Sequence, residues 1–229
     1  VWQKQIKLQD LYANPDLSKM VAMIKLSQTD HGLPPISKDP AASQISAVSV
    51  SPAQRRIWVN MQLSPESRAY HLQSTYHIHA ADSELIKKAI KHIVAKHEVL
   101  RTVFVQQGGQ PMQQVLSVDD YQLQKSLITE AACHHTQAAW ETLTQFYTQP
   151  FDLENGPLYK AIIITLQDGS LILGLSAHHI ILDGWSVRII EQELSDTYAK
   201  LVAKRNLSTA PAIQYRDYTT WLNQQLENE

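Results

Sequence analysis

The chain has 229 residues, 44% of them hydrophobic, which is enough for one large domain or two small ones with a real core. Its formal net charge of −2, without any block of like charges, argues against nucleic acid and against an anionic membrane as partners. The single cysteine excludes an internal disulfide framework and favours a reducing, cytoplasmic setting. The sequence contains no apolar run of about 18 residues and does not begin with a signal peptide.

Residues 1–27 are predicted to form a small helical unit. A short amphipathic segment at 6–12 is followed by Pro15, and apolar residues at helical spacing then mark a second helix around residues 17–24. Residues 28–47 contain Gly32, three prolines and several serines and are predicted to form a linker. The main domain is expected to span residues 48–229. Because the chain does not begin with Met, we expect it to be a piece of a longer protein.

The main domain is predicted to mix helices and strands. Ser51 and Pro52 are a good N-cap and a good first residue for its first helix. The further elements, in chain order, are a strand at 70–78, a helix at 83–97, a strand ending near 104, a turn at 108–109, a strand at 112–116, a helix at 136–148, strands at 158–166 and 171–176, a helix at 185–204 and a last helix from about 215 to 229. This order predicts an α/β (α+β) sandwich.

The stretch from Ala177 to Ser186, AHHIILDGWS, is the most informative part of the sequence. Two adjacent histidines and an Asp-Gly pair lie between a strand end and a helix start, where backbone N–H groups and a positive helix end are also available. Such a site can stabilise a developing oxyanion. A pair of histidines by itself is more often structural. The second pair, His134-His135, is not followed by Asp-Gly, and we assign it no role.

Five stretches together resemble a known family. The motif HHxxxDG at 178–184 is similar to the active-site motif of the chloramphenicol acetyltransferase-like superfamily. The other four resemble motifs of condensation domains from nonribosomal peptide synthetases, and these are SPAQRRIW at 51–58, KHEVLRTVF at 96–104, FDLENGPL at 151–158 and YRDYTTW at 215–221. Lys96 stands where the family usually has Arg. The resemblance implies that residues 48–229 are the N-terminal lobe of a two-lobed condensation domain, and that residues 1–27 are the last helices of a peptidyl carrier domain.

The implied reaction is peptide-bond formation. The amine of an aminoacyl group on a downstream carrier attacks the thioester of an acyl or peptidyl group on an upstream carrier. Both substrates would arrive on 4'-phosphopantetheine arms, with no metal and no directly bound cofactor. The implied partners are the two carrier domains, the second lobe and an adjacent adenylation domain. Because the active site of the family lies between the lobes, we expect this fragment to be folded but inactive on its own.

The resemblance also implies roles for residues in and near the motif. His179 matches the catalytic position. As a general base it would contribute about 10²–10⁴-fold, but an α-amino group with a pKa of about 7.7–8 is already partly neutral, so positioning of the amine is an open alternative. For His178 we expect a structural role, with direct chemistry as the lesser alternative.

The remaining assignments concern Asp183 and its neighbours. Asp183 is expected to pair with a basic residue, and Arg101 is the first candidate and Lys96 the second. Gly184 is expected to allow close backbone approach and to offer its N–H to an oxyanion. Trp185 and Ser186 are expected to open the helix, with Ser186 capping it or lining the tunnel.

Two other functions stay open. One is a coenzyme A-dependent acyltransferase of the same superfamily, for which the carrier-like segment and the additional motifs would be unnecessary. The other is a non-catalytic lobe that recruits carrier or tailoring partners, although such domains commonly alter the histidine motif. A heterocyclisation domain would have Asp in place of His178, an epimerase would have a different opening motif, and the carrier-like segment argues against a chain-initiating starter domain.

Overall fold

The computed structural model describes residues 12–13, 15–26, 34–38, 47–122 and 127–227. The chain divides into two units, Val1–Ile36 and Ser37–Glu229, and the boundary falls within the residues predicted as linker. In the first unit, helix α2 (Leu17–Leu26) confirms the predicted second helix. The other segment expected there, residues 6–12, lies outside the described residues apart from Tyr12. The identity of this unit as a carrier domain stays a prediction.

The second unit contains two sheets. The smaller sheet is antiparallel and has the order β1-β4-β3, formed by β1 (Ala47–Ser49), β4 (Gln110–Val115) and β3 (Thr102–Gln107). The larger sheet has the order β2-β7-β6-β5, formed by β2 (His71–Ile78), β7 (Leu171–His178), β6 (Tyr159–Leu166) and β5 (Ile128–Cys133). Strands β2, β7 and β6 are antiparallel neighbours, whereas β5 runs parallel to β6. The central strands β6 and β7 therefore carry the hairpin that leads to the histidines.

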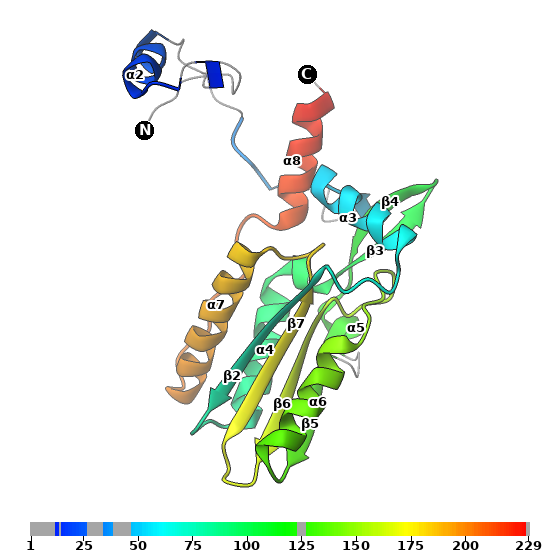
Figure 1. Cartoon of the computed structure of the whole chain (residues 1–229), viewed down its shortest axis with the longest axis vertical. Coiled ribbons are helices and arrows are strands. Elements are labelled where there is room, and N and C mark those ends of the chain that lie inside the picture. The colour runs from blue at the N-terminus through cyan, green and yellow to red at the C-terminus, as the bar shows by residue number, and fades with distance from the viewer. Residues whose placement is uncertain (1–11, 14, 27–33, 39–46, 123–126, 228–229) are drawn as a thin grey trace. The chain divides into compact units, whose positions relative to one another are not determined.

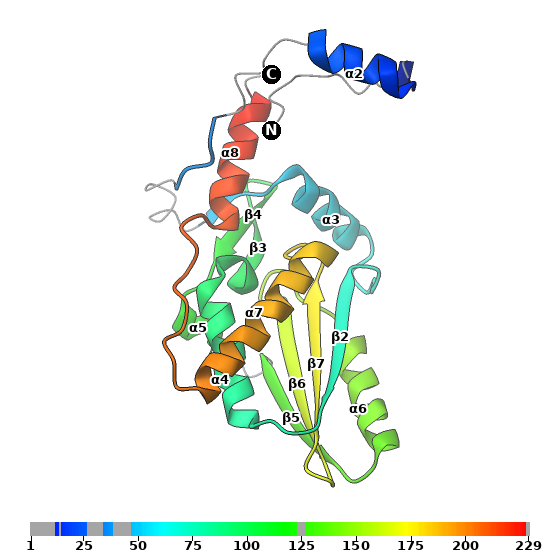
Figure 2. The ribbon, with the colours of Figure 1, turned by 90° about the vertical axis from the view of Figure 1, so that its left-hand side faces the viewer.

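Helices cover both faces of the larger sheet (Figures 1 and 2). Helices α4 (Ser83–Lys96) and α7 (Gly184–Val202) pack on one face, and α6 (Thr136–Thr148) packs on the other. Because both faces are covered, β6 and β7 read as nearly continuous apolar runs rather than as alternating ones. The remaining helical segments are α3 (Pro52–Leu63), the 3₁₀ turn η2 (Glu98–Arg101), α5 (Val118–Gln122) and α8 (Tyr215–Glu227).

The helix and turn signals of the sequence are confirmed. Ser51 Oγ accepts the Gln54 N–H at 3.2 Å, Gln54 Oε1 accepts the Ser51 N–H at 3.0 Å, and Pro52 is the first residue of α3. In the turn between β6 and β7, Gly169 has a φ of +81°, which glycine adopts without strain. These local features fix the start of α3 and the register of the hairpin.

Four elements were not predicted, namely β1, η2, α5 and β5. The sequence of β5, ITEAAC, is a poor strand by composition, and it forms a strand because its backbone pairs with β6. The second histidine pair also has a function that the sequence pattern does not indicate. His135 is the N-cap of α6, where its Nδ1 accepts the Ala138 N–H at 3.2 Å.

Candidate active site

The histidine pair is held from both sides by neighbouring strands. The His178 N–H donates to the Leu158 carbonyl at 2.9 Å, and the His179 N–H donates to the Tyr70 carbonyl at 2.7 Å. The apolar bridge Ile180-Ile181-Leu182 is buried and packs into the main core. The loop between β7 and α7 is therefore anchored by backbone hydrogen bonds at its start and by apolar burial in its middle.

His178 is a buried, neutral side chain. It is fully buried, and its Nδ1 accepts the Ile180 N–H at 3.2 Å. Burial, together with the nearby charges of His71 and His179, lowers the pKa of His178 to about 3. The position fits the expected structural role, because a neutral imidazole that binds its own loop holds that loop in place.

His179 lies beside a groove of about 370 Å³ whose lining also includes core residues such as Ile57 and Ile190. The side chain is half-buried. The groove is bordered by residues from α3, the segment before β3, the histidine loop and the starts of α7 and α8, among them Gln54, His97, His179, Asp183 and Tyr215. A substrate in this groove would meet His179 and backbone of the loop together.

The groove is also where the sequence motifs meet. Gln54 of α3 donates its Nε2–H to the Ile180 carbonyl at 3.4 Å, which ties α3 to the histidine loop. The hydroxyl groups of Ser51 and Tyr215 lie 3.1 Å apart and join the start of α3 to the start of α8. On the other side of the loop, the Phe151 ring packs edge-on against His178, with 5.7 Å between the ring centroids. Segments far apart in the sequence thus support one loop.

The expected ion pair of Asp183 was wrong. Asp183 is exposed and is the N-cap of α7, where its Oδ1 accepts the Ser186 N–H at 2.7 Å. Hydrogen bonds from the Ser186 side chain and backbone lower the pKa of its carboxyl. As the N-cap, the carboxylate is turned back onto the first turn of α7, and neither Arg101 nor Lys96 forms an ion pair with it; their carboxylate partners are Glu98 and Glu193.

The two cations proposed for Asp183 have other partners. The Arg101 guanidinium donates to the Leu116 carbonyl and lies 3.6 Å from the Glu98 carboxylate. The Lys96 ammonium lies 2.8 Å from the carboxylate of Glu193, which also meets the Nε2 of His97 at 2.6 Å. Arg101 therefore supports the junction of η2 and β4, and Lys96 joins α4 to α7.

The residues after Asp183 open the helix at the edge of the groove. Gly184 is the first residue of α7, and a methyl group built on it would meet no atom within 4 Å, so packing within this chain does not require a glycine there. Its N–H stays a candidate donor to an oxyanion. Trp185 is 76% exposed, and Ser186 borders the groove without capping the helix, because Asp183 is the cap.

Two basic residues near His178 have no part in the predictions from the sequence, namely the half-buried His71 and the buried Lys160. His71 is paired with His178 across β2 and β7, and Lys160 lies near the start of β6 with 5% of its surface exposed. Lysine within an otherwise apolar, β-branched strand was a signal that could have been used, because lysine is rarely buried without a reason. The position of His71 next to His178 depends on strand pairing and has no sequence signal.

Within the described residues, no group of three or more His, Cys, Asp or Glu side chains could hold a metal ion. None of the helices in the described ranges is long and apolar enough to cross a membrane.

A scan against protein families matches residues 44–229 to the condensation domain family. The chain is 34% identical over 230 residues to malpibaldin synthetase of Mortierella alpina, a match that covers 95% of this chain and 4% of that protein. The fold is similar to a solved complex of the X-domain and OxyB from teicoplanin biosynthesis, with a TM-score of 0.74, 23% identity, and coverage of 86% of this chain and 42% of that one.

It is also similar to a mutant starter condensation domain of rhizomide synthetase RzmA in complex with C8-CoA, with a TM-score of 0.71, 18% identity, and coverage of 82% of this chain and 44% of that one. The chain thus spans less than half the length of each of these three proteins.

Proposed function

The chain belongs to the condensation domain family, and we propose that it forms peptide bonds between two carrier-bound substrates. An amine on the acceptor attacks the carbonyl carbon of the donor thioester. A C–N bond forms and the C–S bond breaks, the thiolate of the donor carrier leaves and takes a proton, and the amine loses one. The acyl chain ends on the acceptor as an amide. The 4'-phosphopantetheine arms of carrier domains would deliver both substrates.

The observation that carries this proposal is the groove beside His179. His179, the loop residues up to Asp183, and Ser186 in the first turn of α7 all border this groove. Gly184, the first residue of α7, is exposed next to it in the chain. Imidazole can accept the proton of the amine or orient the amine by a hydrogen bond. The Gly184 N–H, at the start of α7 and outside the capping bonds of Asp183 to Ser186 and Val187, is the candidate donor to the oxyanion of the tetrahedral intermediate.

The further partners are a second lobe that closes the groove, carrier domains on either side and an adjacent adenylation domain. The chain spans only 42–44% of the related solved structures, which is consistent with one lobe of two. Because positioning supplies much of the rate in such a transfer, we expect the 229-residue chain alone to be inactive. Product formation by this chain alone at the rate of the two-lobe protein would contradict that expectation.

The test is turnover by the complete two-lobe protein with carriers loaded with donor and acceptor. Product on the acceptor carrier is followed by intact-protein mass for the wild type and for His179→Ala. We expect the variant to lose about 10²-fold or more of the rate. His134→Ala is the matched control, because His134 is an exposed histidine of the second pair and should not affect turnover.

Each outcome decides something. Equal rates for wild type and His179→Ala would show that His179 is neither base nor positioning group. Absence of product from a wild type that still binds loaded carriers would favour a recruiting role; the similar X-domain was solved in a complex with OxyB. We favour catalysis because His178, His179, Asp183 and Gly184 are all present.

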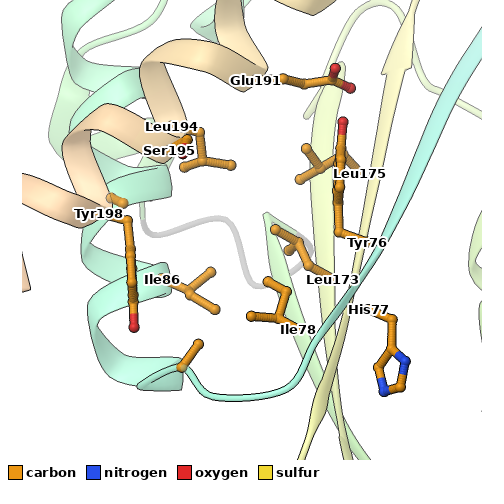
Figure 3. A pocket seen from close by; sticks show the side chains of 12 residues that line it. Tyr76, His77, Ile78, Ile86, Leu173, Leu175, Glu191, Leu194, Ser195 and Tyr198 are labelled. Carbon is orange, nitrogen blue, oxygen red and sulfur yellow. The ribbon is translucent and has the colours of Figure 1, made fainter.

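A cavity beneath α7 could hold an apolar part of the donor acyl group (Figure 3). It has a volume of about 350 Å³, within the usual range for small-molecule sites. Its walls are apolar side chains of β2, β7, α4 and α7, and Glu191 and the Tyr76 hydroxyl lie at one end. Leu175 and Glu191 also border a narrow gap that reaches Leu182, which borders the groove of His179.

We therefore propose that an aliphatic part of the donor passes under α7 into this cavity. The related starter domain solved with C8-CoA is consistent with such a donor. Ala89 is fully buried in the cavity wall, so Ala89→Trp would fill the space. In the complete protein, the variant should lose activity with long apolar donors and keep it with glycyl donors. Equal losses for both donors would contradict the use of this cavity.

A further inference from the structure

A polar cluster of two buried residues and one half-buried residue lies on the face of the larger sheet that α6 covers, beside the histidine loop. It consists of His71, Lys160 and His178, with the Phe151 ring packed against all three. The mechanism proposed above uses none of these groups directly. Their arrangement nevertheless determines how the loop that presents His179 is held.

The hydrogen bond to Ile180 determines the tautomer of His178. Its Nδ1 accepts the Ile180 N–H, so in the neutral imidazole the proton must be on Nε2. Nε2 is fully buried and has no hydrogen-bond partner among the described residues. A buried N–H donor without an acceptor is rare in native proteins and calls for a partner.

His71 lies opposite His178 in the register of β2 and β7. One of its ring nitrogens makes a hydrogen bond with the backbone of Tyr147. A carbonyl can only accept, so this nitrogen carries the proton and Nδ1 is left as an acceptor. Nδ1 is buried and, within the described residues, has no partner either. The cluster thus contains one unused donor and one unused acceptor.

The rings of His71 and His178 are separated by a gap. The centroids are 6.3 Å apart, and both rings pack against Phe151 at 4.8 and 5.7 Å. This separation is too large for a direct hydrogen bond between ring nitrogens and suits a single bridging molecule. The Lys160 ammonium lies 4.3 Å from the Phe151 centroid. Burial, and to a smaller extent the positive charges of Lys160 and Arg68, lower the pKa of His71, which keeps Nδ1 an acceptor.

We propose that one buried water bridges Nε2 of His178 and Nδ1 of His71, and that His71 is a positioning residue for the condensation reaction. The bridge holds His178 in the tautomer whose Nδ1 binds the Ile180 N–H. That bond fixes the bend of the loop directly after His179. The effect of His71 on the reaction thus passes through His178 and the loop, without contact with substrate.

The first test needs no activity and uses the 229-residue chain. Long-range ¹H–¹⁵N NMR of ¹⁵N-histidine-labelled chain should show His178 as the neutral Nε2–H tautomer, with a ring N–H that exchanges slowly and gives a cross-peak to water. His71→Phe should shift this N–H signal and remove the water cross-peak. His71→Asn keeps a side-chain oxygen and should retain both. An Nδ1–H tautomer in the wild type, or an unchanged N–H signal in His71→Phe, would overturn the proposal.

The second test rests on the proposed function and uses the complete two-lobe protein. His71→Phe should lower kcat about tenfold while KM for the loaded donor stays unchanged, because a displaced loop harms positioning more than binding. His71→Asn should recover most of the loss. His79→Phe, just beyond the end of the same strand and exposed, is the control and should have no effect.

The two tests fail independently. If the wild type forms no product, the proposed function fails, and the NMR measurement still decides the bridge. If His71→Phe is not folded, as judged by loss of chemical-shift dispersion, His71→Asn replaces it. In that case we expect the slowly exchanging His178 N–H and its water cross-peak to be retained. Loss of the cross-peak in His71→Asn would overturn the account.

Discussion

Replacing Asp183 tests whether this carboxylate caps α7 or neutralises a buried cation. In the structure its Oδ1 accepts the Ser186 N–H at 2.7 Å, and its carbonyl accepts the Val187 N–H at 2.9 Å. Asp183→Ala removes the first bond and leaves the second. Asp183→Asn keeps an oxygen that can cap the helix and removes only the charge. The pair of variants therefore separates the cap from the charge.

The structure sets the expected magnitudes. Loss of an N-cap side chain costs about 1 kcal/mol, and Asn caps nearly as well as Asp. The charge at the helix start is worth about 0.3–1 kcal/mol at an exposed position, and Asp183 is exposed. We expect Asp183→Ala to lower the free energy of unfolding by about 1–2 kcal/mol. Asp183→Asn should lower it by about 0.5 kcal/mol.

The assay is urea unfolding of the 229-residue chain, followed by circular dichroism from about pH 3 to pH 8. Hydrogen bonds to Ser186 lower the pKa of Asp183 in the folded state. The stabilisation is therefore complete above the unfolded pKa of about 3.9 and is lost as the pH falls through the lower folded value. The difference between wild type and Asp183→Ala should be constant from about pH 5 to 8 and shrink below about pH 4.

The competing account makes a different prediction. If Asp183 neutralised Arg101 or Lys96, Asp183→Asn would leave a buried cation without its partner at a cost of about 3–5 kcal/mol. A loss of that size for Asp183→Asn, equal to or larger than that for Asp183→Ala, would refute the cap.

Three further predictions concern single residues. Gly174→Ala should destabilise the chain by about 1–3 kcal/mol, since its Cβ would lie 2.5 Å from Leu143 and 2.8 Å from Ile162; unchanged urea midpoints would contradict this. Gly184→Ala should change the free energy of unfolding by less than about 0.5 kcal/mol and leave turnover of the complete protein intact, because the added methyl group would meet no atom within 4 Å and the backbone N–H remains. A large loss of turnover would mean that the substrate needs the space that this methyl group would occupy. With a pKa of about 3, folded His178 stays neutral while unfolded histidine takes a proton below about pH 6.5. The free energy of unfolding should therefore fall from about pH 6.5 toward pH 4, and it should fall less steeply in His178→Asn. Parallel curves of unfolding free energy against pH for wild type and variant would contradict the prediction.

The sequence determined the elements whose signals are local. The cap at Ser51, the turn at Gly169 and the apolar periodicity of α4, α6 and α7 depend on neighbouring residues, and each was found at the predicted place within a few residues. The histidine motif and its position between a strand end and a helix start were also local. Together with its flanking motifs it was enough to identify the family, and the match over residues 44–229 confirms that identification.

Only the tertiary structure decided which groups meet. Strand β5 exists because β6 offers it a backbone edge, and His71 lies against His178 because β2 pairs with β7 in one register. The partner of Asp183 was mistaken for a similar reason. The sequence shows a carboxylate and two cations but not which of them meet. In the folded chain Glu98 pairs with Arg101, Glu193 pairs with Lys96, and Asp183 caps α7. Hydrogen bonds and ion pairs act over a few ångströms, so partners distant in sequence are chosen only when packing brings them together.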